Sequence, residues 1–206
     1  KAEEVTLIGV TKTQSAATVR ALLEAGITDI GENRVQEWLQ KEPELAGLSY
    51  RCHLIGHLQR NKAKFLPGHI DMMQSLDNLR TMETLDRLYA QAGRCLDVLI
   101  EVNIGGEAQK NGIDKGELLA FAQRVDACEN LNLRGIMTIP PYGEPENMRP
   151  YFKQMYNLFV DIQAKKMDNS TVNILSMGMS SDFPVAIEEG ATMVRVGTEL
   201  FGPREY

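Results

Sequence analysis

The chain has 206 residues, of which 43% are hydrophobic, and this is enough for one substantial core. Its net charge is −6, from 22 basic and 28 acidic residues, and it lacks the basic stripe that is typical of nucleic-acid binding. No apolar run approaches the ~20 residues that cross a bilayer, and no signal-peptide pattern is found. These features predict a cytoplasmic protein with no membrane or nucleic-acid partner.

Eight short apolar runs alternate with helical patterns along the chain. The predicted strands are Val5–Thr11, Thr28–Ile30, Tyr50–Ile55, Asp71–Ser75, Leu96–Asn103, Leu133–Thr138, Thr171–Ser176 and Thr192–Val196. Most of these runs are continuous rather than alternating, as in strands that are buried on both faces of a parallel sheet. The helices predicted between them are Ser15–Ala25, a long helix capped by Asp77 or Asn78, Glu117–Cys128, Asn147–Lys166 and Asp182–Glu189.

Strict alternation of strand and helix predicts parallel βαβ units. Eight units in one chain without a linker predict a single-domain (β/α)₈ barrel over residues 1–206. A doubly wound open sheet is the alternative, but no Gly-x-Gly-x-x-Gly follows the first strand, whose turn is Thr11-Lys-Thr-Gln14. The chain starts almost at its first strand, so we expect a missing element before Lys1.

The three cysteines, Cys52, Cys95 and Cys128, are widely spaced and lie inside apolar patterns. An odd number of such residues predicts buried free thiols in a reducing compartment.

Lys12 follows the first strand, at the end of the barrel where such folds keep their active sites. One interpretation is a strand-end lysine whose ammonium group extends into solvent. The other is a partly desolvated amine of lowered pKa that forms a Schiff base.

The turns after the last two strands are rich in small polar residues. Ser176, Ser180, Gly197 and Thr198 offer hydroxyl groups and close backbone approach, and a short helix beginning near Thr198 would aim its N-terminus at an anion. These turns predict a phosphate site, with ordinary helix caps as the alternative. Together with Lys12 they indicate a site for a phosphorylated aldehyde.

Other polar residues have two interpretations each. Arg195 lies between two valines and therefore faces the barrel interior or mouth, either in a buried ion pair or as a donor to a ligand. Asn33 contacts a ligand edge or caps the next helix. His53 and His57 are four apart, but a strand and a glycine turn separate them, so no zinc site is predicted; His53 belongs to the sheet and His57 to the mouth.

Three further features have ordinary explanations. The alternating cations Arg60, Lys62 and Lys64 suggest a solvated helix face. Lys110 is expected to be an exposed loop lysine, and Tyr142 is expected to pack against the rim.

Six blocks in order resemble the pyridoxal phosphate (PLP) homeostasis proteins, the single-domain relatives of alanine racemase. The blocks are Val10-Thr-Lys-Thr13, Gly31-Glu-Asn33 with Gln36-Glu37, His53-Leu-Ile-Gly56 with Leu58-Gln-Arg-Asn-Lys62, Gly135-Ile-Met-Thr-Ile139, Ser176-Met-Gly-Met-Ser180 and Arg195-Val-Gly-Thr-Glu-Leu-Phe-Gly202. Members of this family usually carry another helix before the first strand.

The resemblance implies a fold-type III PLP barrel. In it Lys12 matches the lysine that forms the Schiff base, and Arg195 matches the arginine that faces the pyridine nitrogen. The matched phosphate positions are Ser180, Gly197 and Thr198, and Asn33 matches a residue near the cofactor. Ser176 is assigned to the same cofactor site as a further hydroxyl.

The implied function is intracellular PLP (vitamin B6) and amino-acid homeostasis, with PLP held on Lys12 without robust catalysis. PLP-dependent apoenzymes are the implied client partners, and a monomer is expected. One alternative is an amino-acid racemase that uses Lys12 on one face and His57 or Tyr142 on the other. A second is a PLP-free Schiff-base aldolase of similar architecture.

Overall fold

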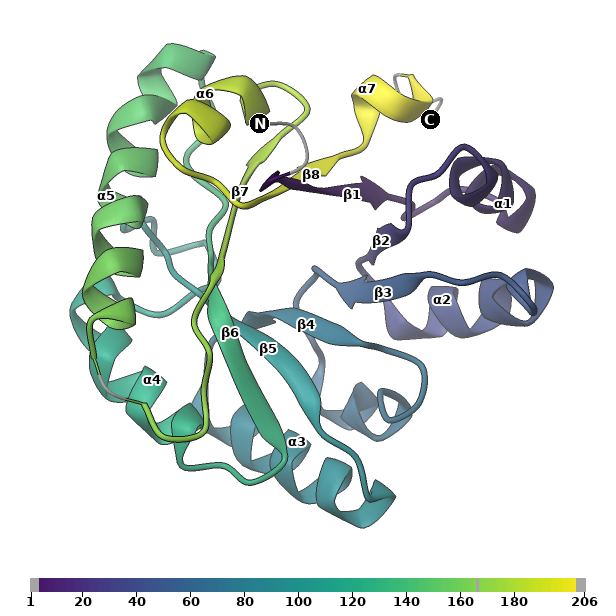
Figure 1. Cartoon of the computed structure of the whole chain (residues 1–206), viewed down its shortest axis with the longest axis horizontal. Helices are drawn as coiled ribbons and strands as arrows, with labels where there is room; N and C mark the ends of the chain where they lie inside the picture. The colour runs from purple at the N-terminus through teal and green to yellow at the C-terminus, as the bar shows by residue number, and fades with distance from the viewer. Residues whose placement is uncertain (1–3, 166, 203–206) are drawn as a thin grey trace.

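The computed structural model describes residues 4–165 and 167–202, and its strands form a closed parallel barrel in chain order (Figure 1). The strands are β1 Thr6–Val10, β2 Asp29–Glu32, β3 Arg51–Leu54, β4 Met72–Leu76, β5 Leu96–Glu101, β6 Leu131–Met137, β7 Ile174–Met179 and β8 Met193–Val196. The last strand pairs with the first, with Gly9 opposite Val196. All eight predicted strands are present, so the barrel is confirmed and the open sheet is wrong.

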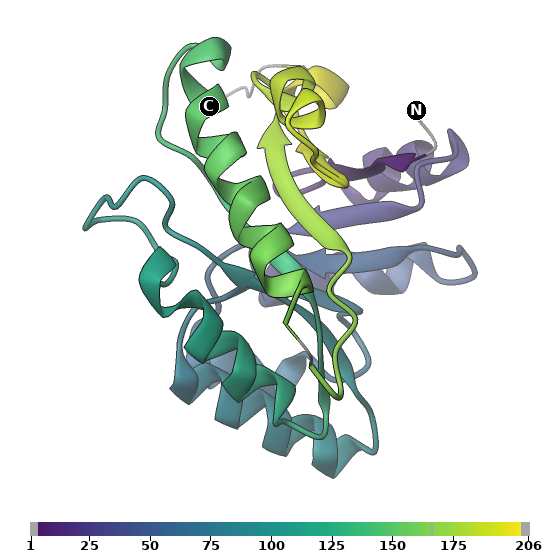
Figure 2. The same ribbon diagram turned by 60° about the vertical axis from the view of Figure 1, so that its left-hand side comes forward.

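Helices cover the outside of the barrel (Figures 1 and 2). The α-helices are α1 Ala16–Glu24, α2 Val35–Lys41, α3 Leu79–Ala92, α4 Leu118–Asp126, α5 Pro145–Gln163, α6 Phe183–Glu188 and α7 Thr198–Phe201. The 3₁₀ helices are η2 Glu42–Leu45, η3 Arg60–Phe65 and η4 Lys115–Glu117. The long α5 packs against β7 and α6, which places it along the last third of the barrel.

Local capping chemistry fixes the ends of several helices as predicted. The Ser15 hydroxyl accepts from the backbone N–H of Thr18 at 3.1 Å and begins α1. The Asn78 side chain accepts from the backbone N–H of Thr81 at 2.9 Å and begins α3. The helix that was predicted to reach Lys166 ends at Gln163, and Lys166 itself lies outside the described residues.

The seventh strand differs from its prediction in a way that affects the site. It runs to Met179, so Ser176 lies within the strand and not in the turn that follows it. The backbone of Gly178 has a φ of +92° and the β7–β8 register shifts between Ser176 and Met179, so pairing continues past the expected end. Ser176 is fully buried and its hydroxyl meets Gln74 and Arg195 in the barrel interior instead of lying at the rim.

The barrel interior has an apolar layer below a polar one. Residues two apart on a strand share a face, and on four strands a polar residue follows an apolar one at this spacing. The pairs are Met72 and Gln74 in β4, Leu99 and Glu101 in β5, Ile174 and Ser176 in β7, and Met193 and Arg195 in β8. Met72, Leu99, Met137 and Ile174 pack together as a separate small core. The polar layer lies on the side where the strands end, which is the usual location of barrel sites.

Two burial predictions are wrong. Cys95 is exposed, because it lies in the loop before β5 that follows the left-handed Gly93, whereas Cys52 and Cys128 are buried as expected. Tyr142 does not pack against the rim but is fully exposed in the loop before α5.

Candidate functional site

Lys12 lies in the middle of a turn that is fixed on both sides. The Thr11 hydroxyl donates to Glu32 Oε1 at 2.7 Å, and the backbone N–H of Thr13 donates to Glu37 Oε1 at 2.6 Å. Thr13 adopts a left-handed backbone with φ +66°, which is uncommon for a residue with a β-branched side chain. The half-buried Lys12 is thus held in one place by its neighbours.

Lys41 also stabilises this turn. Its ammonium group donates to the Thr11 carbonyl oxygen at 3.0 Å and to Glu32 Oε1 at 2.5 Å. Burial raises the pKa of the Glu32 carboxyl, although the hydrogen bonds from Lys41 and Thr11 oppose the rise. A buried carboxylate with these charge-assisted partners fixes the end of β2 against the turn after β1.

The turns after β7 and β8 lie against each other. The Ser180 hydroxyl accepts from the backbone N–H of Gly197 at 3.1 Å. A Cβ on Gly197 would lie 3.4 Å from Cβ of Val10, the residue that ends β1. The structure therefore brings the Ser180, Gly197 and Thr198 turns next to the strand end that leads to Lys12.

Arg195 points into the barrel interior, as predicted, and is almost fully buried. It donates to the Ser176 hydroxyl at 2.6 Å and to the Thr138 carbonyl oxygen at 2.8 Å. Burial lowers the pKa of this guanidinium to about 10, and the negative charges of Glu101 and Asp182 oppose that change. The group remains charged at neutral pH.

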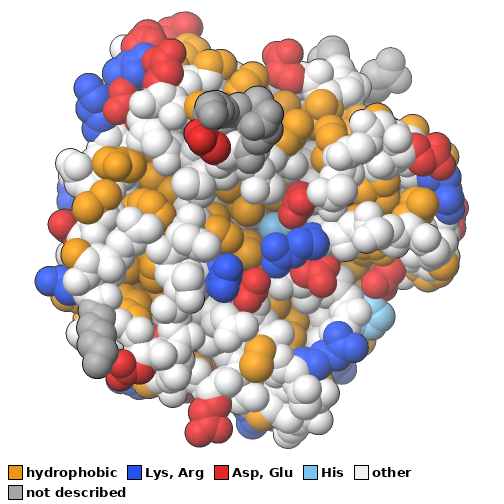
Figure 3. All heavy atoms as spheres, in the orientation of Figure 1, with side chains coloured by type: hydrophobic (Ala, Val, Ile, Leu, Met, Phe, Trp, Pro, Cys, Tyr) orange, Lys and Arg blue, Asp and Glu red, His pale blue; other side chains and the backbone are white. Residues whose placement is uncertain are grey.

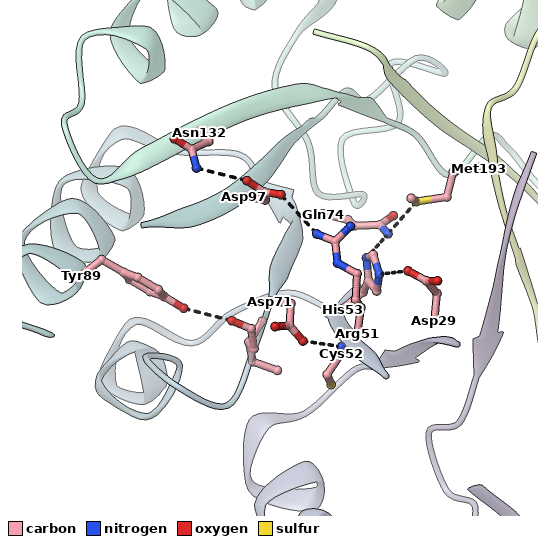
Figure 4. Close-up of polar contacts among 11 residues, drawn as sticks. Asp29, Arg51, Cys52, His53, Asp71, Gln74, Tyr89, Asp97, Asn132 and Met193 are labelled. Carbon is pink, nitrogen blue, oxygen red and sulfur yellow. Dashed lines mark hydrogen bonds and ion pairs between the residues drawn. The ribbon is translucent and has the colours of Figure 1, made fainter. Parts of the chain in front are cut away.

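A hydrogen-bonded chain continues from Arg195 across the barrel interior. Ser176 donates to Gln74 Oε1 at 2.7 Å, and Gln74 Nε2 lies 3.1 Å from His53 Nδ1. Figure 4 shows the far part of this chain, where His53 Nε2 lies 2.9 Å from Asp29 and Gln74 also contacts the Met193 sulfur.

The donor and the acceptor of each hydrogen bond in this series follow from Arg195, the charged residue at one end. Arginine only donates, so the Ser176 hydroxyl accepts a hydrogen bond from Arg195 and donates one to Gln74 Oε1. The Gln74 amide group then faces His53, whose Nδ1 accepts while its Nε2–H donates to Asp29. One orientation satisfies every member, so Ser176 and Gln74 hold Arg195 in a defined place.

Two buried carboxyl groups lie in the field of Arg195. Burial raises the pKa of Glu101 to about 7, with a further increase from Asp77 and an opposing effect of Arg195. Burial also raises the pKa of Asp182, whose side chain accepts from the backbone N–H of Met179 at 2.6 Å. These groups balance the guanidinium charge inside the barrel.

Asn33 follows β2 and lies against Gly56. A Cβ on Gly56 would come within 2.5 Å of the Asn33 carbonyl oxygen, so the turns after β2 and β3 touch closely. His53 is in the sheet and His57 is on the exposed turn, as expected, with His57 Nδ1 3.7 Å from Asp77.

Lys110 differs from its prediction, because it is half-buried and donates to the Pro140 carbonyl oxygen at 2.9 Å.

Sequence reasoning missed the residues that support the site. Gln74 lies inside β4 and Thr138 directly follows β6, both as ordinary polar residues, and Lys41 lies on a helix like any surface lysine. The useful signal was the spacing of two from an apolar interior residue, which marks Gln74, Glu101 and Ser176 as inward-facing once the barrel is assumed. Within the described ranges, no group of three His, Cys, Asp or Glu residues could hold a metal ion.

The fold is a closed (β/α)₈ barrel in which the turns after β7 and β8 lie beside the strand end that leads to Lys12, and the family comparison agrees with this class of fold. The family described as alanine racemase, N-terminal domain, matches residues 1–205. Relatives named pyridoxal phosphate homeostasis protein match almost the whole chain. The one from Aquifex aeolicus is 43% identical over 201 residues, which are 97% of this chain and 87% of that protein. The one from Pseudomonas aeruginosa is 41% identical over 201 residues, or 97% and 85% of the two chains.

Solved structures give the same result. PipY of Synechococcus elongatus, solved with PLP bound, has a TM-score of 0.89 and 36% identity, over 97% of this chain and 93% of that chain. Alanine racemase of Clostridium difficile shares the fold alone, with a TM-score of 0.75 and 17% identity over 99% of this chain and 53% of that one. The chain belongs to the alanine racemase N-terminal domain family and, within it, to the pyridoxal phosphate homeostasis proteins.

Proposed function

We propose that this chain binds PLP through a Schiff base on Lys12 and acts in PLP and amino-acid homeostasis without robust catalysis. The observation that carries the proposal is the fixed Lys12 turn beside the Ser180–Gly197 contact, at the same end of one barrel. The homeostasis name and the bound PLP of the relatives support it.

The donor set fits this cofactor. A phosphate monoester needs hydrogen-bond donors and close backbone approach. The paired turns offer the Ser180 and Thr198 hydroxyls and the close backbone of Gly197, whose N–H holds the Ser180 side chain in place. The Asp182 carboxylate accepts a hydrogen bond from the backbone N–H of Met179. We assign the phosphate to these three residues and a position near the cofactor to Asn33.

PLP supplies an aldehyde that condenses with an amine, and a ring that withdraws electrons from the attached carbon. We assign the amine to Lys12, because the bonds of Thr11 and Thr13 hold its turn still. We assign Arg195 to the ring nitrogen of the cofactor, where its permanent positive charge would disfavour a second proton. Ser176 acts through Arg195 and not as a phosphate ligand.

The absence of robust catalysis rests on the residues available for a second proton transfer. Racemisation needs an acid or base on each face of the reacting carbon. Tyr142 is fully exposed and His57 lies against Asp77, so neither is held toward the Lys12 turn. If the chain is a racemase instead, PLP-loaded protein will exchange the Cα hydrogen of alanine for solvent deuterium, and we expect no such exchange.

The direct test is PLP addition followed by borohydride reduction and peptide mass spectrometry. We expect the visible Schiff-base absorbance and one reduced PLP adduct, located on Lys12. Lys12→Ala should lose both, whereas the exposed-lysine control Lys64→Ala should keep both. A Lys12→Ala protein that keeps the same absorbance would overturn the assignment, and trapping of a sugar phosphate on Lys12 without PLP would favour the aldolase.

We further propose that PLP passes from this carrier to PLP-dependent apoenzymes, because a Schiff base is reversible. The measurement is activation of an apo-aminotransferase by the PLP-loaded protein, compared with the same total free PLP. A cytoplasmic location is part of the proposal, and it is supported by the free Cys52, Cys95 and Cys128. None of the helices described is long and apolar enough to cross a membrane.

A further inference from the structure

A cavity of about 450 Å³ lies at the same end of the barrel, between the turns that follow β2 and β3. Its polar lining comes from Asn33, Arg34, Gln36, His57, Gln59 and Lys62. Neither Lys12 nor the Ser180, Gly197 and Thr198 turns line it. Asn33, which we assign to a position near the cofactor, is on its wall, so the cavity adjoins the site proposed for PLP, and its size suits a small molecule.

The charge of this cavity is opposite to that of the whole chain. The protein has a net charge of −6, yet no aspartate or glutamate lines the cavity. Among the residues described, neither Arg34 nor Lys62 forms an ion pair or a side-chain hydrogen bond, while His57 already faces Asp77 at 3.7 Å. Two uncompensated cations at one hollow attract an anion.

Gln36 provides an independent indication of a ligand. Its Nε2 atom is buried but has no hydrogen-bond partner among the described residues. A buried amide N–H without an acceptor is uncommon in native proteins, because its loss of hydration is uncompensated. Gln36 is on the cavity wall, so a rotation of its side-chain amide would bring this N–H to a carboxylate or phosphate oxygen of a ligand.

The wall of the cavity is held rigidly. Gly56 lies against the Asn33 backbone with no space for a side chain, and its carbonyl oxygen accepts from the Ser75 hydroxyl at 2.7 Å. A fixed wall positions Arg34 and Gln36 relative to Lys62 before any ligand arrives, which lowers the entropy cost of binding.

We infer that this cavity binds a small organic anion, through a carboxylate or phosphate group held by Arg34, Lys62 and the Gln36 amide. The guanidinium and ammonium groups neutralise the ligand charge, and the amide fixes the orientation of one oxygen. The inference concerns a subsite beside the proposed PLP site, and its test does not require PLP to be attached to Lys12.

The test is an NMR titration of the PLP-loaded protein with acetate in one arm and inorganic phosphate in the other. We expect at least one anion to shift the Gln36 side-chain amide resonance saturably, and the arm that does so identifies the anionic group. Arg34→Met and Lys62→Met should each weaken that binding at least about tenfold, because each removes one charge-assisted hydrogen bond.

Arg60→Met is the matched control, since Arg60 is exposed on the same 3₁₀ helix as Lys62 but does not line the cavity. Equal weakening by Arg60→Met and Arg34→Met, or no saturable shift at Gln36 with either anion, would overturn the inference. Shifts confined to Gly197 and Thr198 would do the same. Lys12→Ala, which should lose PLP attachment, is titrated in the same way. Anion binding that persists in this variant shows that the anion site can be tested independently of PLP attachment.

Discussion

Arg195 carries a permanent charge inside the barrel, and the residues around it explain how the fold accommodates that charge. Its two hydrogen bonds reach Ser176 and the Thr138 carbonyl oxygen, and Ser176 is fixed in turn by Gln74. A buried guanidinium without such partners would cost several kcal/mol of stability. The polar chain therefore belongs to the stability of the fold as much as to the site.

Glu101 gives a pH-dependent prediction. Burial raises its pKa to about 7 from an ordinary value of 4.5. Between these two pH values the folded protein keeps a proton that the unfolded chain has lost, so the Glu101 contribution lowers stability as pH rises through this window and stays constant above it. Glu101→Gln removes this penalty. The free energy of unfolding of the variant, relative to that of the parent, should therefore be ~1–3 kcal/mol higher at pH ~8 than at pH ~5.

The measurement is urea denaturation of the PLP-free parent and variant across this pH range. Glu129→Gln, which removes a carboxylate at an exposed position, is the control. If the stabilities of the parent and of Glu101→Gln change in parallel over this pH range, the raised pKa of Glu101 is contradicted.

At the scale of elements, the closure of the barrel depends on close approach between neighbouring strands. Gly135 in β6 pairs with Ile174 in β7, and a Cβ at Gly135 would clash with the Ile174 carbonyl oxygen. Backbone cannot move aside like a flexible side chain, so the pairing of β6 with β7 requires glycine here.

Gly135→Ala should therefore lower the free energy of unfolding by roughly 3 kcal/mol or more, as strained overpacked sites do. Gly26→Ala is the control, because Gly26 has a positive φ of +97° but nothing within 4 Å of the added atom. It should cost only about 1–2 kcal/mol from backbone strain. Chemical denaturation measures both, and equal losses would show that steric clash between β6 and β7 is not the cause.

At the scale of the whole molecule, the surface predicts a monomer. The large exposed hydrophobic side chains of the described residues are spread over many elements, for example Leu79 on α3, Leu119 on α4 and Ile187 on α6. On the face seen in Figure 3, charged side chains of both signs lie among hydrophobic ones. Stable interfaces bury ~800 Å² on each partner, which scattered single side chains do not supply.

Sedimentation equilibrium should therefore give a mass of 23.0 kDa over a wide concentration range, with and without PLP. A mass that rises toward twice this value with concentration would show a dimer and contradict the prediction.

The sequence alone determined the order of strands and helices, the closed barrel and the position of Lys12 after the first strand. It also determined the Ser15 and Asn78 caps, because strand periodicity and capping are local properties of the chain. Only the tertiary structure decided which side chains meet, because Ser176 and Gln74 are 102 residues apart and come together inside the closed barrel. The contacts of Lys41 with Thr11 and Glu32, and the Gln36 side-chain amide without a partner among the described residues, could not be predicted for the same reason. A hydrogen-bond partner across a barrel depends on strand register and closure, which no local pattern encodes.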